Sequence, residues 1–192
     1  MDTLWLYGFD ARAPIGVSDP AWTDERRARY LIRPNILRPL SVDPRVWPGV
    51  LPAGLTDGAA PDYWADLGAL RHACIARGLG QGSAILVALV VLGGSDHAGA
   101  LLVPCSPEAI DPVWEPLGWD VADNGLVSGL SNCGFSPDLE DTSGIRLRFG
   151  SRLNEYGLFN ELTEAEAFRV LSDLRMPEHA PFLIHRIFLV LW

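Results

Sequence analysis

The sequence predicts an α+β fold, in which a mostly antiparallel sheet is covered by about three helices. Short apolar and β-branched runs are separated by turn signals, which is typical of antiparallel strands. Segments with helical periodicity are few and do not alternate regularly with the strands, which argues against a doubly wound fold. The chain has 192 residues, of which 48% are hydrophobic, so we expect residues 1–192 to form a single domain with a sizeable core.

The strongest strand signal is the run Ala84–Leu92, which is continuously apolar and rich in β-branched residues. Such a run predicts a central strand that is covered on both faces. After a turn signal at 93–96, Ala98–Val103 is expected to return as its antiparallel partner. Further strands are predicted at Thr3–Phe9, at Ile145–Phe149, and at Phe182–Trp192, which we also expect to be central.

A β-hairpin is predicted around Asn124-Gly125, within the stretch Gly118–Phe135. Asn-Gly favours a type I′ turn, because both central residues of that turn need positive φ. The flanking strands would be Trp119–Ala122 and Leu126–Leu130. Because side chains alternate along a strand, Trp119 and Val121 should share one face and Asp120 the other.

Three segments have the spacing of helices. Asp19-Pro20 predicts a helix from Pro20 to about Leu31, with Asp19 as its N-cap. Asp62–Arg77 carries apolar residues at spacings of three or four, which predict one buried stripe and place Cys74 in the core. Gly78 suits the C-terminal end of that helix. The buried stripe is expected at Trp64, Leu67, Leu70 and Cys74, with His72 near the surface.

The last helix is predicted to open with a capping box at Thr163–Glu166 and to end near Arg175, before Pro177. Its buried residues are expected to be Ala167, Val170, Leu171 and Leu174. Between the first two helices, prolines punctuate residues 33–61, so neither a long helix nor a central strand fits there. The apolar residues of this segment predict that it packs on the domain.

Charge and composition exclude several classes of function. The formal net charge is −9, and the cations do not cluster as nucleic-acid binding requires, so we expect no nucleic-acid partner. All fifteen basic residues are arginine. The lack of lysine excludes Schiff-base chemistry, a pyridoxal phosphate attachment site and a Walker A loop. No dinucleotide fingerprint or zinc spacing is present, so no cofactor and no metal are expected.

Cysteine usage and the N-terminus bear on localisation. Three widely spaced cysteines make a disulfide framework improbable, which favours a reducing cytosol. The N-terminal stretch MDTLWLYGFD begins with an acidic residue and lacks the basic region of a signal peptide. The longest apolar run is too short to span a bilayer, so no membrane association is expected and the predicted localisation is cytoplasmic.

Chemistry-bearing side chains gather in the stretch Gly118–Phe135. Asp120 and Asp123 are carboxylates that either shape the hairpin or contact a cationic partner. Gly129–Cys133 approaches the nucleophile-elbow pattern but has Cys133 where the second glycine belongs. Ser131 or Cys133, with His97 and an aspartate, therefore form a candidate hydrolase or transferase site.

A second candidate site is an acidic surface. Pro104–Pro116 carries Glu108 and Trp114, and Trp is enriched at interface hot spots. Glu140 adds a carboxylate further along, where it would meet either a partner or the nearby Arg146 and Arg148. An acidic surface favours association with a basic protein through electrostatic steering.

In size, acidity and lack of catalytic motifs, the chain resembles the small acidic immunity proteins of bacterial toxin/immunity competition systems. The resemblance implies stoichiometric binding of a basic partner, such as a toxin, and no catalysis. The residues expected to bind this partner are Glu108, Trp114, Asp120, Asp123 and Glu140. Two alternatives stay open: the candidate enzyme above, and a structural or oligomer-forming subunit that uses the apolar C-terminal strand.

Overall fold

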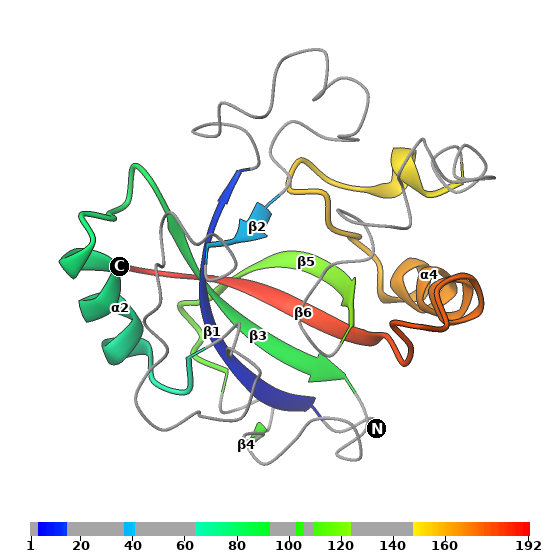
Figure 1. The fold of residues 1–192 in the computed structure, drawn as a ribbon, viewed down its shortest axis with the longest axis horizontal. Coiled ribbons are helices and arrows are strands. Elements are labelled where there is room, and N and C mark those ends of the chain that lie inside the picture. Colours follow the sequence, from blue (N-terminus) through cyan, green and yellow to red (C-terminus); the bar gives the residue numbers. More distant parts are fainter. Residues whose placement is uncertain (1–3, 15–36, 41–63, 93–102, 106–109, 124–147) are drawn as a thin grey trace. The chain divides into compact units, whose positions relative to one another are not determined.

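The computed structural model of the protein describes residues 4–14, 37–40, 64–92, 103–105, 110–123 and 148–192. Figure 1 shows how the helices and strands follow one another along the chain. In chain order they are β1 (Leu4–Pro14), β2 (Leu37–Pro39), α2 (Leu67–Ala76), β3 (Ile85–Leu92), β4 (Val103–Cys105), β5 (Glu115–Ala122), the 3-10 turn η3 (Gly150–Arg152), α4 (Leu162–Arg175) and β6 (Leu183–Val190).

The strands form one sheet in the order β2-β1-β3-β6-β5, with β4 paired to β1. β1 runs antiparallel to both β3 and β4. The predicted α+β class with an antiparallel sheet is therefore confirmed. The described residues contain two α-helices, α2 and α4, and the predicted helix Pro20–Leu31 lies outside them.

By the contacts between its Cα atoms in space, the chain divides into two compact units. The first comprises Met1–Ala13, Pro39–Pro116 and Phe188–Trp192, and the second comprises Pro14–Arg38 and Leu117–Ile187. The predicted single domain stays a prediction. Most of the proline-rich segment 33–61 lies outside the described residues.

In the first unit, β1 and β3 form the longest described antiparallel pair. Their register runs from Leu4 opposite Leu92 to Arg12 opposite Ile85, with an irregularity between Leu6 and Gly8. The other edge of β1 is covered by three separate segments. β4 pairs with residues 4–6, Trp64 exchanges two backbone hydrogen bonds with Phe9, and the Leu40 amide donates to the Ala11 carbonyl. Covering an edge in this way prevents it from pairing with another chain.

The prediction that Ala98–Val103 would pair with the strand at Ala84–Leu92 is wrong for its described residue. Val103 pairs with Leu6 of β1, while residues 98–102 lie outside the described part. β3 and β6 confirm the two predicted central strands, since each has a neighbour on both sides. β1 extends five residues beyond the predicted end at Phe9, to Pro14.

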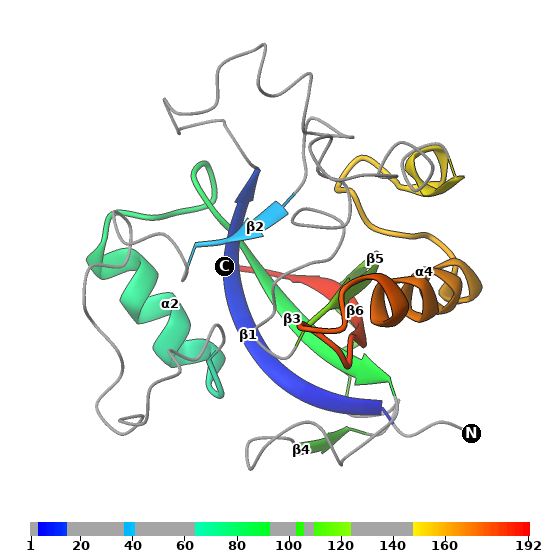
Figure 2. The same cartoon turned by 45° about the vertical axis from the view of Figure 1, so that its right-hand side comes forward.

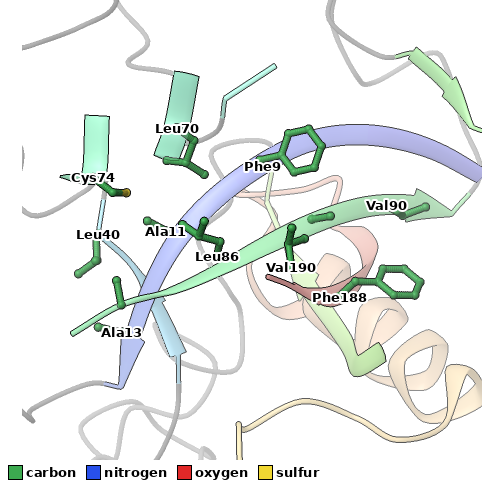
Figure 3. Close-up of a cluster of buried hydrophobic side chains, with 12 residues drawn as sticks. Phe9, Ala11, Ala13, Leu40, Leu70, Cys74, Leu86, Val90, Phe188 and Val190 are labelled. Atoms are coloured by element: carbon green, nitrogen blue, oxygen red, sulfur yellow. The ribbon is translucent and has the colours of Figure 1, made fainter. Parts of the chain in front are cut away.

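A hydrophobic cluster fills the space between β1, β3 and α2 (Figure 3). From α2, Leu70 and Cys74 point at the strands, and each is fully buried. Phe9, Ala11 and Ala13 of β1 lie on the facing side, because alternate strand residues share a face. The predicted core position of Cys74 is confirmed, and His72 is exposed as expected.

Helix α2, which was predicted at Asp62–Arg77, begins later than predicted, at Leu67. Asp66 is its N-cap and accepts a hydrogen bond from the Ala69 amide at 2.6 Å. Trp64 is therefore not helical, and its backbone pairs with β1 instead. At the other end, Gly78 has a φ of 71° and closes the helix, as its sequence position predicted.

In the second unit, α4 packs on a cluster of three phenylalanines. Phe149, Phe159 and Phe168 have ring centroids 5.2–5.9 Å apart and are almost fully buried. A backbone bridge ties Phe159 to Trp119 of β5. Gly118 beside it is needed for this close approach, because a Cβ there would lie 2.8 Å from the Phe159 carbonyl oxygen.

The existence of α4 and its end before Pro177 are confirmed, but two predicted details are wrong. Its N-cap is Glu161, without a side-chain hydrogen bond, so Thr163 does not open a capping box. The buried residues are Ala165, Phe168 and Ser172. Val170 and Leu174, which were predicted to be buried, are 52% and 75% exposed, because the helix turns its phenylalanine stripe to the core.

The predicted strand Ile145–Phe149 is also wrong where it is described. Arg148 and Phe149 are helical and lead directly into η3. The guanidinium of Arg148 lies 4.9 Å from the centroid of the Phe149 ring. Residues 145–147 lie outside the described part, as do residues 124–130 of the predicted hairpin, whose first strand is contained in β5.

An ion pair is buried in β1, on the face opposite to Phe9 and Ala11. Arg12 Nε lies 3.2 Å from Asp10 Oδ2, and the two side chains are only 2% and 1% exposed. Residues two apart on a strand share a face, so folding buries both charged groups on the same side of β1. Removing one charge from a buried pair takes away a counterion that the other charge needs, because water cannot replace it there.

We expect Arg12→Met to lower the free energy of unfolding by about 3–5 kcal/mol. Arg169→Met is the matched control, because Arg169 forms a half-exposed pair with Asp173 at 2.9 Å. Arg169→Met should lower the free energy of unfolding by only about 0.3–0.5 kcal/mol. Urea unfolding of both variants measures the difference, and equal losses would show that the Asp10–Arg12 pair contributes no more than a surface pair.

Candidate functional site

Asp123 and His179 form the most chemically capable pair in the described part of the chain. Asp123 follows the last residue of β5, and His179 lies in the loop between α4 and β6. His179 Nδ1 is 3.1 Å from Asp123 Oδ2. The carboxylate is largely buried, whereas 38% of the imidazole side chain is exposed. When Nδ1 carries the proton, Nε2 is left with a lone pair.

Asp120 does not lie on the surface, which corrects its place among the expected partner-binding residues. It is 2% exposed, and one carboxylate oxygen accepts a hydrogen bond from the Val121 amide at 2.8 Å. The alternation that predicted a solvated face fails because Trp119 and Val121 are buried as well. Both faces of this part of β5 are covered.

Trp114 is half-buried and contributes to packing inside the first unit. Its ring lies edge-on to Phe9, with centroids 5.7 Å apart, and is tilted against Phe188 at 6.3 Å. The other expected partner-binding residues, Glu108 and Glu140, lie outside the described residues. The same holds for His97, Ser131 and Cys133 of the candidate enzyme site.

The fold engages many of its cations internally. Arg152 pairs with Glu164 of α4. Other guanidinium groups lie over aromatic rings or donate to backbone carbonyls. Arg71 and Arg77 donate to backbone carbonyls, and Arg148, Arg152 and Arg186 lie over aromatic rings. Arg12 and Arg169 pair with Asp10 and Asp173.

Exposed carboxylates of the second unit show the opposite behaviour. Within the described part of the chain, no hydrogen bond or ion pair holds the side chains of Glu155, Glu161, Glu166 and Glu178. Three of them lie on α4 or within three residues of its ends. The region around α4 therefore presents negative charge to solvent that no described arginine neutralises.

Cys74 is the one cysteine whose environment is described in full, and it is poorly suited to be a nucleophile. Burial of the thiol, followed by the nearby charge of Asp10, raises its pKa from 9.0 to about 11, although Arg77 opposes the shift. The thiol is therefore protonated at neutral pH, and thiolate is the reactive form.

The described residues contain neither a grouped set of metal-binding side chains nor a membrane-spanning helix. No three His, Cys, Asp or Glu side chains in these ranges are grouped as a metal site would require. Neither α2 nor α4 has the length and hydrophobicity to cross a bilayer.

Because the folded state holds the Cys74 proton more tightly than the unfolded chain, stability should fall as pH rises from 9.0 to about 11. Below pH 9 both states keep the proton, so this contribution is constant there. We expect Cys74→Ala to show a smaller fall over the same interval, measured by urea unfolding at a series of pH values. Identical pH profiles for the two proteins would contradict the raised pKa.

The chain was also compared with known proteins. No family model matches it, and no curated protein or solved structure is significantly similar to it.

Proposed function

We propose that the protein is a binding protein that sequesters a basic protein partner. The observation that supports this best is the contrast between its charges. Seven arginines have contacts within the fold, whereas Glu155, Glu161, Glu166 and Glu178 are exposed and have no described partner. With a formal net charge of −9, such a surface attracts cations and speeds their association.

The finer form of the proposal is an immunity-type inhibitor. In this form the protein acts in the cytoplasm and blocks a bacterial toxin by stoichiometric binding. The acidic composition and the outward carboxylates fit such a role, because toxins that act on nucleic acids need clustered cations for phosphate binding. A surface of opposite charge then competes for the same cations.

Affinity purification from the native cells tests the proposed function. The tagged protein should co-purify a basic protein in equimolar amount, and salt of about 0.5 M should weaken the complex by screening its charges. A variant with Glu155, Glu161, Glu166 and Glu178 changed to Gln should bind at least about tenfold more weakly. Recovery of no partner, or of an acidic one that binds equally well to both proteins, would contradict the proposal.

The Asp123–His179 pair supports a second candidate function, acid–base catalysis. A carboxylate that accepts from Nδ1–H fixes the imidazole tautomer, so that Nε2 can take a proton from water or a hydroxyl group. This arrangement differs from the expected site, which used His97. His72 provides a matched control, because it is also exposed but contacts only the Gly68 carbonyl.

If the pair acts in this way, the wild type should hydrolyse p-nitrophenyl acetate about tenfold faster than His179→Gln or Asp123→Ala. His72→Gln should keep the wild-type rate. Long-range ¹H–¹⁵N spectra should show His179 as the Nδ1–H tautomer, and Asp123→Ala should abolish that preference. Equal rates in all four proteins would exclude acid–base catalysis of this ester by the pair.

A further inference from the structure

α4 has a second apolar face, which points away from the core of its own unit. Val170 and Leu174 are one turn apart and therefore adjacent on the helix surface. They are 52% and 75% exposed. Ala167 and Leu171, beside them, are half-buried. We name these four residues the outward stripe. Figure 2 shows α4 and the loop that follows it towards β6.

Among the described residues of the second unit, α4 packs through its other face. Ala165, Phe168 and Ser172 already supply the face that packs on Phe149 and Phe159. A surface helix normally has one apolar face, and a helix with two is usually covered on both sides. Burying an exposed Leu or Val contributes about 1.5–3 kcal/mol, so covering the stripe would stabilise a complex.

The charges around the stripe indicate what covers it. Glu166 lies one turn before Val170, and its exposed carboxylate has no described partner. Glu161 precedes the helix and Glu178 follows it. The two arginines of α4 also adjoin the stripe, but Arg169 is paired with Asp173 and Arg175 has a contact of its own. An apolar centre with an anionic rim complements an apolar centre with a cationic rim. A second copy of this chain would bring the same carboxylates to the interface, and its net charge of −9 would add repulsion.

We propose that the outward stripe of α4 is the docking surface for the basic partner, and that the partner presents a cationic amphipathic helix to it. This inference rests on the proposed binding function and gives that function a location. Leu174 and Val170 supply the apolar contact, as anchors one turn apart on the helix surface. Glu161, Glu166 and Glu178 meet the lysines or arginines that flank the partner's apolar face.

The experiment uses a fluorescent peptide of about 18 residues, composed of Leu and Lys, with Leu at helical spacing. A scrambled peptide has the same composition and charge but no apolar face. Fluorescence anisotropy with the full-length protein should show that the amphipathic peptide binds at least about tenfold more tightly than the scrambled one.

Leu174→Asp and Val170→Asp should each weaken binding of the amphipathic peptide about tenfold or more. Ile75→Asp is the matched control, since Ile75 is 66% exposed on α2, and it should leave the affinity unchanged. Thermal unfolding should show that all three variants are folded, because each changed side chain is exposed. Retained affinity in both α4 variants would overturn the inference.

The outcomes separate this inference from the proposed function. If native cells yield a basic partner that binds wild type and α4 variants equally, the function survives and the docking surface lies elsewhere. If light scattering shows a wild-type dimer that Leu174→Asp dissociates, a second copy covers the stripe and the inference is wrong. If neither a basic partner nor the amphipathic peptide binds the wild type, both proposals fail.

Discussion

The backbone pairing between β1 and β3 is the constraint on which the first unit depends. It holds Phe9, Ala11 and Ala13 on one face, where Leu70 and Cys74 of α2 cover them. The same pairing forces Asp10 and Arg12 onto the other face, where they stay buried as an ion pair. Three short segments then complete the free edge of β1. A strand that is buried on both sides tolerates charge only when the charges are paired.

Much of the fold could be predicted from the sequence, because long apolar runs specify strands and a regular spacing of apolar residues specifies helices. The run at Ala84–Leu92 and the C-terminal run became β3 and β6, and the stripe Leu70–Cys74 became the buried face of α2. The orientation of α4 could not be predicted. Its sequence contains two apolar stripes, and the larger aromatic contact of Phe168 decides which one faces the core.

The candidate site was harder to predict from the sequence, because its contacts join residues that are far apart along the chain. Asp123 and His179 are 56 positions apart, and no spacing rule brings them together. The sequence indicated Asp123 as a turn-forming residue. No sequence pattern indicated a role for His179, which lies just after Pro177. Asp120 was expected in solvent from strand alternation, but alternation indicates exposure only when one face of the sheet is open. Arg148 is helical instead of lying on the predicted strand, and Arg152, four residues later, pairs with Glu164 of α4.

We propose that this protein acts by presenting a surface centred on α4, with an apolar stripe on the helix and carboxylates on and beside it. Hydrogen–deuterium exchange of the full-length protein, with and without the bound basic partner, tests this claim most directly. The account predicts that added protection is concentrated in Leu162–Arg175, with α2 unchanged. Protection that is absent from α4 and appears instead at α2 or along the strands would contradict it.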